Sequence, residues 1–409
     1  MEKKLSGWFL RVRIFTTFAF RNYSPIKIRR IGRTIAEEGR KRREYIMYLH
    51  QRDNWWKFDY DTRAVMNRLG DVRARQGQVL GRMASLGFDF QDEAMLATMS
   101  LELVRSCEIE GEHLDLSQVR SSIARRLGME TAGIVPASRY VDGVVEMLLD
   151  ATQHYDRPLT DERLFGWHNV LFPSGRSGLY SIEVARYRSG EMQVVSGPMG
   201  REVVHYEAPE PERVPEEMSR FIRWVNGDDG SDPVIRSAIA HLWFVSIHPF
   251  DDGNGRIARA ITDMLLARSE CSPKRFYSMS NEIKICQKGY YDVLERTQRG
   301  DGDITAWLLW FLDCLDQALV STEHTLSSVL EKARFWESNS DLVVNERQRK
   351  IINMQFDGFF GKLTSGKWAR IGKCSSDTAL NDIRYLLGKG VLRKNEEGGR
   401  STNYSLVRE

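Results

Sequence analysis

Hydrophobic residues recur at helical spacing through most of the chain. In segments 69–83 and 92–113, apolar residues repeat every three or four positions, and Met95, Met99 and Leu103 form one stripe of the second segment. Such spacing predicts amphipathic helices. We expect further helices at 141–149, 164–171, 216–226, 233–247, 257–269, 290–299 and 305–319. The fold is therefore predicted to be mainly α.

The period changes in two places. Segments 191–196 and 202–206 flank the turn Gly197-Pro-Met-Gly200, which predicts a β-hairpin inserted among the helices. Near the C-terminus, helical patterns at 347–356, 364–371 and 375–387 precede two short strands at 391–393 and 402–407, around a turn at 396–400. This order resembles bacterial winged helix–turn–helix domains. We expect a small α+β domain there, preceded by a linker near 331–345.

Composition narrows the class of protein. The chain has 409 residues, a formal net charge of +3, 42% hydrophobic and 28% charged residues, which is typical of a soluble globular protein. Apolar runs are too short to predict a membrane span. The five cysteines are scattered and never form a C-x-x-C pair. A disulfide framework and a structural zinc site are therefore not expected, and a cytoplasmic location fits best.

Charge divides the chain unevenly. Residues 1–43 hold 13 Lys and Arg against 3 Asp and Glu, residues 361–409 hold 10 against 5, and the middle holds 36 against 48. The basic, aromatic N-terminal segment suits a membrane-surface or nucleic-acid arm, or a poorly ordered extension, which we favour. We predict a basic extension at 1–43, a helical region at 44–115, a core domain at 116–325, and a linker with the C-terminal domain at 326–409.

Candidate chemistry is concentrated in His248-Pro-Phe-Asp-Asp-Gly-Asn-Gly-Arg256-Ile-Ala-Arg259, between two apolar helical segments. Gly253 and Gly255 allow a tight turn whose N–H groups face an anion, at the positive end of the next helix. Arg256 and Arg259 are three residues apart, so both can reach one polyphosphate. Asp252 is suited to Mg²⁺ and His248 to accepting a hydroxyl proton. The set predicts phosphoryl-type transfer.

Each part also has a plainer interpretation. A lone histidine is more often a packed or capping residue, two arginines on a helix more often form a solvated face, and Gly-Asn-Gly is a common turn. The joint occurrence of these residues at fixed spacing favours a functional site.

The pattern H-P-F-x-D-G-N-G-R-x-x-R resembles the signature of the Fic family, whose members mostly transfer AMP from ATP to a protein hydroxyl. The resemblance implies that His248 is the general base and that Asp252 holds Mg²⁺, or Mn²⁺, between the α- and β-phosphates. It implies that Asn254 and Arg256 grip those phosphates and that Arg259 meets the γ-phosphate. Phe250, with Pro249, would fix the loop.

Three further segments resemble the family. The hairpin at 191–206 would be the flap that pairs with an extended target segment; the alternative is an ordinary surface hairpin. Tyr291 and Leu294 would contact the adenine, although helix-spaced aromatics also pack cores. Gln298 stands where many relatives have Asn. The resemblance also raises the prospect of a homodimer.

The third segment, Ser106-Cys-Glu-Ile-Glu110-Gly111, resembles the family's inhibitory motif. Ser106 and Glu110 share one helix face, and Gly111 suits a left-handed cap. Glu110 reaching Arg259 would remove the group that orients the γ-phosphate. The alternative is a solvated helix glutamate. The motif precedes the catalytic helices, as in the class whose inhibitory helix is N-terminal.

The C-terminal domain suggests DNA as a second partner, through 364–407. Lys373, Ser375, Ser376, Arg384 and Arg400 would contact phosphates or bases. Its charge is modest, and Asp377 and Asp382 lie on the predicted reading helix, so a packing or dimer surface is equally open.

Three hypotheses for function follow. The first is a self-inhibited protein adenylyltransferase that uses Mg²⁺-ATP. The second is the same site removing AMP from a modified protein, with Glu110 positioning water. The third is a DNA-binding regulator whose Fic domain senses nucleotides. The target protein, the donor nucleotide and the oligomeric state are not predicted.

Overall fold

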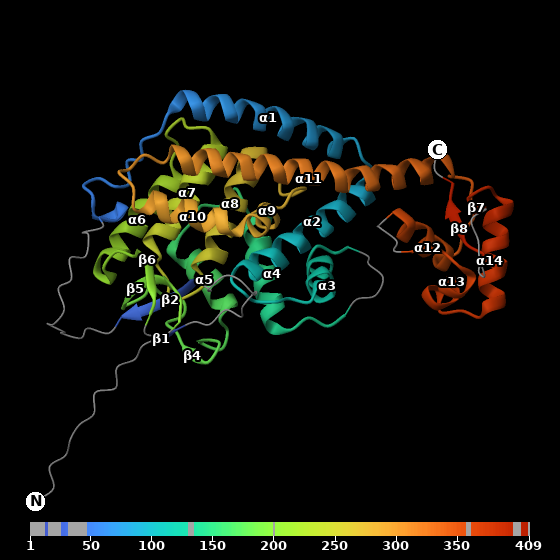
Figure 1. Cartoon of the computed structure of the whole chain (residues 1–409), viewed down its shortest axis with the longest axis horizontal. Helices are drawn as coiled ribbons and strands as arrows, with labels where there is room; N and C mark the ends of the chain where they lie inside the picture. The colour runs from blue at the N-terminus through green and yellow to red at the C-terminus, as the bar shows by residue number, and fades with distance from the viewer. Residues whose placement is uncertain are drawn as a thin grey trace, which may run out of the picture. The chain divides into compact units, whose positions relative to one another are not determined.

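The computed structural model describes residues 13–14, 26–31, 47–129, 135–198, 201–356, 361–395 and 402–407. Its contacts divide the chain into two compact units. The first comprises the described parts of 1–80 and 95–320, and the second those of 81–94 and 321–409. The mainly α prediction is confirmed (Figure 1). No helix among the described residues combines the length and apolarity that crossing a bilayer requires.

The described residues up to Gln298, most of which belong to the first unit, form ten helices and six strands. The helices are α1 (Thr62–Ala84), α2 (Phe88–Ile109), α3 (Leu116–Arg126), α4 (Arg139–Gln153), α5 (Asp161–Leu171), α6 (Val214–Asn226), α7 (Pro233–Ile247), α8 (Asn254–Glu270), α9 (Met279–Ile285) and α10 (Gln287–Gln298). The strands are β1 (Arg13–Ile14), β2 (Ile26–Ile31), β3 (Arg176–Ser177), β4 (Tyr180–Ser181), β5 (Glu191–Ser196) and β6 (Val203–Glu207). Short 3₁₀ turns lie at Leu49–Gln51 and Pro211–Arg213.

Helix α7 forms the centre of this unit. Every residue from Val234 to Ile247 is buried, as a nearly continuous apolar sequence requires. Asp232 caps the helix by accepting from the N–H of Val234 at 2.8 Å, and Pro233 occupies the first turn. Helix α8 packs along α7, so the loop between them is held between two buried helices.

The predicted hairpin is confirmed as β5 and β6, with Val194 opposite Tyr206. It belongs to a four-stranded sheet in the order β1-β2-β5-β6 (Figure 1). Strand β2 pairs antiparallel with all of β5, from Ile26 opposite Ser196 to Ile31 opposite Glu191. Segment 26–31 of the predicted N-terminal extension thus pairs into the sheet. The rest of 1–43, apart from β1, lies outside the described residues.

The second unit contains the predicted C-terminal elements. Helix α11 (Thr305–Ser338) runs into it and is followed by α12 (Glu346–Phe356), α13 (Ser365–Gly372), α14 (Ser376–Gly388), β7 (Leu392–Lys394) and β8 (Tyr404–Leu406). Helix α11 extends into the predicted linker at 331–345 as far as Ser338. Ser375 caps α14 as predicted by accepting from the N–H of Thr378.

A compact apolar core holds this C-terminal module together. It includes Ile351 on α12, Trp368 on α13 and Leu386 on α14, all fully buried. The two strands pair with Leu392 opposite Leu406. The predicted turn at 396–400, including Arg400, lies outside the described residues. The order of helices and strands is the predicted one, and its assignment as a winged helix stays a prediction.

Candidate active site

His248 lies at the C-terminal end of α7 in an unusual backbone conformation. Its φ is 51°, in the left-handed region that residues other than glycine seldom adopt. Its N–H still donates to the carbonyl of Phe244 at 3.0 Å. Such strain persists only where the surroundings enforce it, and here it turns the chain from α7 into the loop 249–253.

The imidazole of His248 is buried and has one ring nitrogen without a partner. Its Nδ1 lies 3.3 Å from the carbonyl oxygen of Val245, and since a carbonyl only accepts, Nδ1 carries the proton. Burial, and after it the nearby Arg188 guanidinium, lowers the pKa of His248 to about 4. The ring is therefore neutral at pH 7, and its buried Nε2 has no hydrogen-bond partner. An unprotonated, unpartnered nitrogen can receive a proton.

The loop after His248 is fixed from within. Phe250 is fully buried and stacks on the His168 ring, with centroids 4.3 Å apart. The amide of Asn254 accepts from the N–H of Phe250 and donates to its carbonyl, at 3.0 and 2.8 Å. Phe250 thus lies in the core, as the resemblance implies. The Asn254 amide holds the loop in this structure, and its contact with phosphate stays a prediction.

His168 on α5 is a positioning residue that the sequence pattern did not indicate. Its Nδ1 accepts from the N–H of Ala185 at 3.2 Å, so its Nε2 carries the proton and donates to the carbonyl of Asp252 at 3.1 Å. Burial lowers the pKa of His168 to about 4, which keeps this tautomer neutral. A buried histidine on a helix has no local signature, and only its contact with the loop reveals the role.

Arg259 is held by the helix that contains the predicted inhibitory motif. Its Nε donates to Ser106 Oγ at 2.8 Å, and its Nη2 donates to the Ser106 carbonyl at 2.9 Å and to Glu110 Oε1 at 2.8 Å. The sequence-predicted contact between Glu110 and Arg259 is therefore present. Arg259 Nη1 is buried and has no hydrogen-bond partner.

Arg256 has a second set of partners, which the sequence did not predict. Its Nη1 donates to the Tyr140 hydroxyl at 2.5 Å and to Glu112 Oε2 at 3.3 Å, and the Tyr140 hydroxyl in turn donates to Glu112. Its Nη2 lies 3.6 Å from Asp252 Oδ1. Arg256 Nε is buried and unpartnered. Nothing in the sequence indicated that Glu112 contacts Arg256, apart from its position directly after Gly111.

Two glycines let the acidic segment approach the loop. Gly111 has a φ of 81° and ends α2, where the N–H of Glu112 donates to the carbonyl of Cys107 at 2.9 Å. A Cβ added to Gly255 would lie 2.0 Å from Glu110 Oε1. Only a glycine at 255 therefore admits the Glu110 carboxylate in this position.

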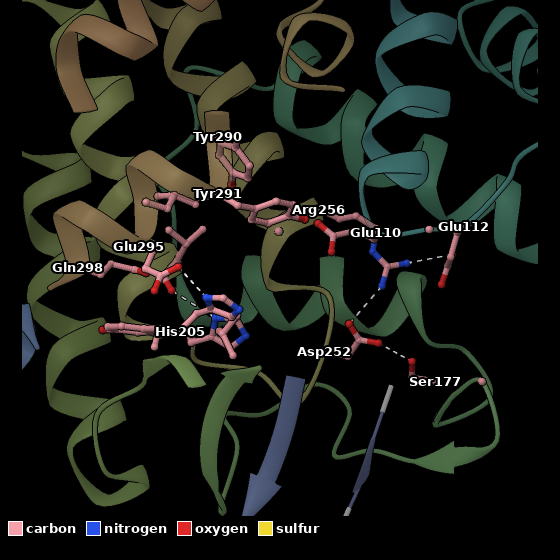
Figure 2. Close-up of a pocket in the computed structure, with 18 of the residues that line it drawn as sticks. Glu110, Glu112, Ser177, His205, Asp252, Arg256, Tyr290, Tyr291, Glu295 and Gln298 are labelled. Carbon is pink, nitrogen blue, oxygen red and sulfur yellow. Dashed lines mark hydrogen bonds and ion pairs between the residues drawn. The ribbon is translucent and has the colours of Figure 1, made fainter. Parts of the chain in front are cut away.

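These groups surround a cavity of about 550 Å³ (Figure 2). Tyr291 and Leu294, which were predicted to contact the adenine, line the cavity from α10. Burial raises the pKa of the Tyr291 hydroxyl. His205 and Glu295 also line it, with His205 Nδ1 2.6 Å from Glu295 Oε2, and were not predicted. The predicted residues that line the cavity are Glu110, Gly111, His248, Asp252, Gly255, Arg256, Tyr291 and Leu294. Ser106, Phe250, Gly253, Asn254 and Arg259 support it from behind.

Asp252 is the residue suited to a divalent cation. Its Oδ2 accepts from Ser177 Oγ, and its Oδ1 accepts from the N–H of Gly253 at 2.5 Å. The described residues contain no cluster of three or more His, Cys, Asp or Glu side chains placed for a metal. One carboxylate beside buried guanidinium groups fits Mg²⁺ that takes its other ligands from phosphate oxygens and water.

Comparison with known proteins bears on the same residues. A family model described as Fic/DOC family matches residues 158–266, which contain the whole segment from His248 to Arg259. The chain contains a Fic/DOC domain. A second model, described as a domain of unknown function (DUF4172), matches residues 48–129, upstream of the Fic/DOC domain and including Glu110.

Curated relatives of the Fic/DOC domain carry the name protein adenylyltransferase Fic. The protein of Culex quinquefasciatus is 28% identical over 225 residues, and that of Drosophila yakuba is 27% identical over 228. Each match covers 53% of this chain and 40% of the relative, so the chain spans less than half the length of these proteins. A solved Fic family protein from Desulfovibrio desulfuricans G20 is 22% identical, with a TM-score of 0.49, over 85% of this chain and 97% of that one.

The residues predicted to contact DNA lie in the second unit. Lys373, Ser375, Ser376 and Arg384 are exposed. Asp382, expected on the reading face of α14, is instead buried and accepts from Arg347 Nε at 2.7 Å and from Trp368 Nε1 at 3.1 Å. It therefore does not repel a ligand of that face. DNA binding stays a prediction.

Proposed function

We propose that the chain is a protein adenylyltransferase that transfers AMP from ATP to a hydroxyl side chain of a target protein. The observation that carries the proposal is a set of three buried nitrogen atoms without partners: His248 Nε2, Arg256 Nε and Arg259 Nη1. Leaving such groups unpaired is costly, so their concentration beside one cavity favours a ligand that satisfies them. The ligand that fits two guanidinium groups and a base is a polyphosphate next to a hydroxyl.

The chemical step uses His248 as the base. The target hydroxyl gives its proton to His248 Nε2 while its oxygen forms a bond to the α-phosphorus of ATP. The bond from the α-phosphorus to the bridging oxygen breaks, and pyrophosphate leaves with that electron pair. Arg256 and Arg259 neutralise the charge that develops on the phosphates. Asp252 would hold Mg²⁺, which supplies charge neutralisation and orients the phosphates when bound.

We further propose that Glu110 inhibits the enzyme. Its carboxylate accepts a hydrogen bond from Arg259 Nη2 and lines the cavity. In that arrangement the Glu110 carboxylate competes with a bound phosphate for the hydrogen-bond donors of Arg259. The carboxylate also repels the negatively charged phosphate oxygens. ATP would then bind in a pose unsuited to in-line attack. A cytoplasmic location accords with the free thiols of all five cysteines.

The test is AMP incorporation from α-labelled ATP by three full-length proteins: wild type, Glu110→Gly and Glu108→Gly. Glu108 lies on the same helical turn and pairs with Arg105 at 2.6 Å, so its variant controls for helix damage. We expect Glu110→Gly to incorporate roughly 10- to 100-fold more label than wild type, which is the size of a typical coupling between two sites. Equal incorporation by the two glycine variants would contradict the inhibitory role.

Two other outcomes correspond to the remaining hypotheses. Loss of AMP from a modified protein that required Glu110 would favour a de-AMPylase. A salt-sensitive, sequence-selective DNA shift that Arg384→Ala removed would favour a DNA-binding regulator.

A further inference from the structure

The flap of the Fic/DOC domain has a strand of its own chain along one edge. Strand β2 pairs with β5 through six residue pairs, among them Ile28 opposite Val194 and Arg29 opposite Gln193. Segment 26–31 therefore pairs with β5 by strand addition, in which an extended segment docks on the edge of a sheet.

The other strand of the hairpin faces a helix. Helix α10 packs beside β6, where the guanidinium of Arg299 donates to the carbonyl oxygens of Val204 and His205 at 2.6 and 3.0 Å. Since α10 lies against β6, the edge of the hairpin that accepts an added strand is that of β5. In this structure β2 occupies it.

The occupied edge borders the proposed reaction site. Val194 on β5 and Tyr206 on β6 line the same cavity as His248. The Tyr206 hydroxyl also donates to the carbonyl of Ser246 at 2.6 Å, two residues before the base. Val194 pairs with Tyr206 on one side and with Ile28 on the other. The middle of β2 is thus paired with a strand residue that lines the cavity.

The sequence of β2 explains why this arrangement blocks rather than reacts. Ile26-Lys-Ile-Arg-Arg-Ile31 contains no Ser, Thr or Tyr, so it has no hydroxyl to receive AMP. We propose that residues 26–31 are an intramolecular stand-in for the target, which holds the target's position on β5 and must leave before an extended target segment can dock. This inference rests on the proposed function. In this proposal β2 regulates the binding of the target, whereas Glu110 regulates the binding pose of the nucleotide.

Tethering gives the strand an advantage over a target. A segment of the same chain competes at an effective concentration in the millimolar range. A target at micromolar concentration and equal intrinsic affinity is therefore disfavoured by about 10²- to 10³-fold until β2 is released.

Cysteine cross-linking in the full chain tests the occupancy without depending on catalysis. Arg29 and Gln193 are directly opposite, and side chains in such pairs are close enough for a disulfide. We expect Arg29→Cys/Gln193→Cys to form an intramolecular disulfide on oxidation, identified by mass spectrometry. Arg29→Cys/Glu191→Cys, off register by two residues, is the matched control and should cross-link at least about tenfold less. Equal cross-linking of the two pairs, or disulfides that join two chains, would overturn the proposal.

A hydroxyl scan then tests whether the strand lies in the target's register. In the Glu110→Gly protein, each residue from 26 to 31 is replaced by Thr in turn. We expect one of the six proteins to incorporate AMP on the introduced Thr, and incorporation to disappear with His248→Ala. An enzyme that labels other hydroxyls but none of these six would contradict the register.

Releasing the strand completes the test. The probe is a synthetic peptide of residues 24–33 that carries Thr at the position labelled in the scan. Proline at 28 and 29 removes both N–H donors from the middle of β2, whereas alanine at both positions keeps them. We expect Ile28→Pro/Arg29→Pro to lower the KM for the peptide by about 10²-fold relative to Ile28→Ala/Arg29→Ala. An unchanged KM would exclude competition between β2 and the peptide. A chain that cross-links in register but never transfers AMP would reject the proposed function, whereas the pairing of β2 with β5 would still hold.

Discussion

Arg259 in the Fic/DOC domain and Asp382 in the C-terminal module are both buried charges, but their surroundings differ. Asp382 accepts two hydrogen bonds from Arg347, one from Gln348 and one from Trp368. Burial alone would raise the pKa of Asp382, but hydrogen bonds from Arg347 and Trp368 lower it. Arg259 has partners in Ser106 and Glu110, yet its Nη1 remains buried and unpaired.

The difference is between a buried charge whose hydrogen-bond partners satisfy it and one that keeps a donor without a partner. A buried charge that only stabilises a fold gains most when every donor and acceptor is satisfied, as at Asp382. Around the cavity, His248, Arg256 and Arg259 each keep one unsatisfied nitrogen. Under the proposed function, a bound polyphosphate and the target hydroxyl would provide partners for these nitrogens.

The largest effect is expected at the base. In the Glu110→Gly protein, His248→Ala should reduce AMP incorporation by roughly 10²- to 10⁴-fold, because no group remains to take the hydroxyl proton. Incorporation from α-labelled ATP measures it. His113→Ala, at an exposed histidine outside the cavity, is the control and should retain full incorporation. Labelling that persisted without His248 would reject the mechanism.

The next effect concerns stability alone. Asp382→Ala should lower the free energy of unfolding of the C-terminal module by about 3 kcal/mol, because it leaves Arg347 and Trp368 without their acceptor. Hydrogen exchange of residues 346–407 in the full chain measures the loss. Asp377→Ala, exposed on the same helix, should cost less than about 1 kcal/mol. If AMP incorporation per folded molecule fell with Asp382→Ala, this charge would have more than a structural role.

The pH dependence follows from the lowered pKa of His248. A base with a pKa of about 4 stays unprotonated at pH 5, whereas one with the ordinary value of 6.5 would be mostly protonated. We therefore expect initial rates of the Glu110→Gly protein to be nearly constant from pH 8 to pH 5 and to decline as the pH falls through about 4. A midpoint near 6.5 would mean roughly 30-fold lower activity at pH 5 and an exposed base.

Stability should change over the same range, so folding must be monitored alongside the rate. Burial lowers the pKa of His50 and His168 to about 4 and that of His241 to about 3. Below pH 6.5 the unfolded chain then binds more protons than the folded one. The free energy of unfolding should therefore fall as the pH drops from 6.5 towards 4.

The smallest effect is expected at Glu112. Its carboxylate lies 3.3 Å from Arg256 Nη1 but is 39% exposed, so solvent screens the pair. Glu112→Gln should tighten ATP binding by about two- to fivefold, because it removes a negative charge near the phosphates. Calorimetry of the Glu110→Gly protein with and without the change measures it. A weaker affinity would show that Glu112 orders Arg256 for the nucleotide instead.

The sequence predicted the local parts of this molecule. The segment from His248 to Arg259, the hairpin β5–β6 and the cap at Ser375 depend on short-range spacing, and the structure contains each of them. The contact of Glu110 with Arg259 was reached through a family resemblance.

The missed features depend on distant contacts. His168 and Tyr140 acquire their roles only when α5 and α4 pack near the loop, and nothing in their own segments marks them. The pairing of 26–31 with 191–196 joins two segments that are far apart in the sequence, and a basic composition suggested an extension instead. Helix α11 continues into the predicted linker as far as Ser338.

The most direct measurement compares ATP labelled at the α-phosphate with ATP labelled at the γ-phosphate, using the Glu110→Gly protein with and without His248→Ala. The account predicts that the α-label becomes bound to protein only when His248 is present, while the γ-label is released as pyrophosphate. Protein labelled from the γ-phosphate, or labelled from the α-phosphate regardless of His248, would contradict it.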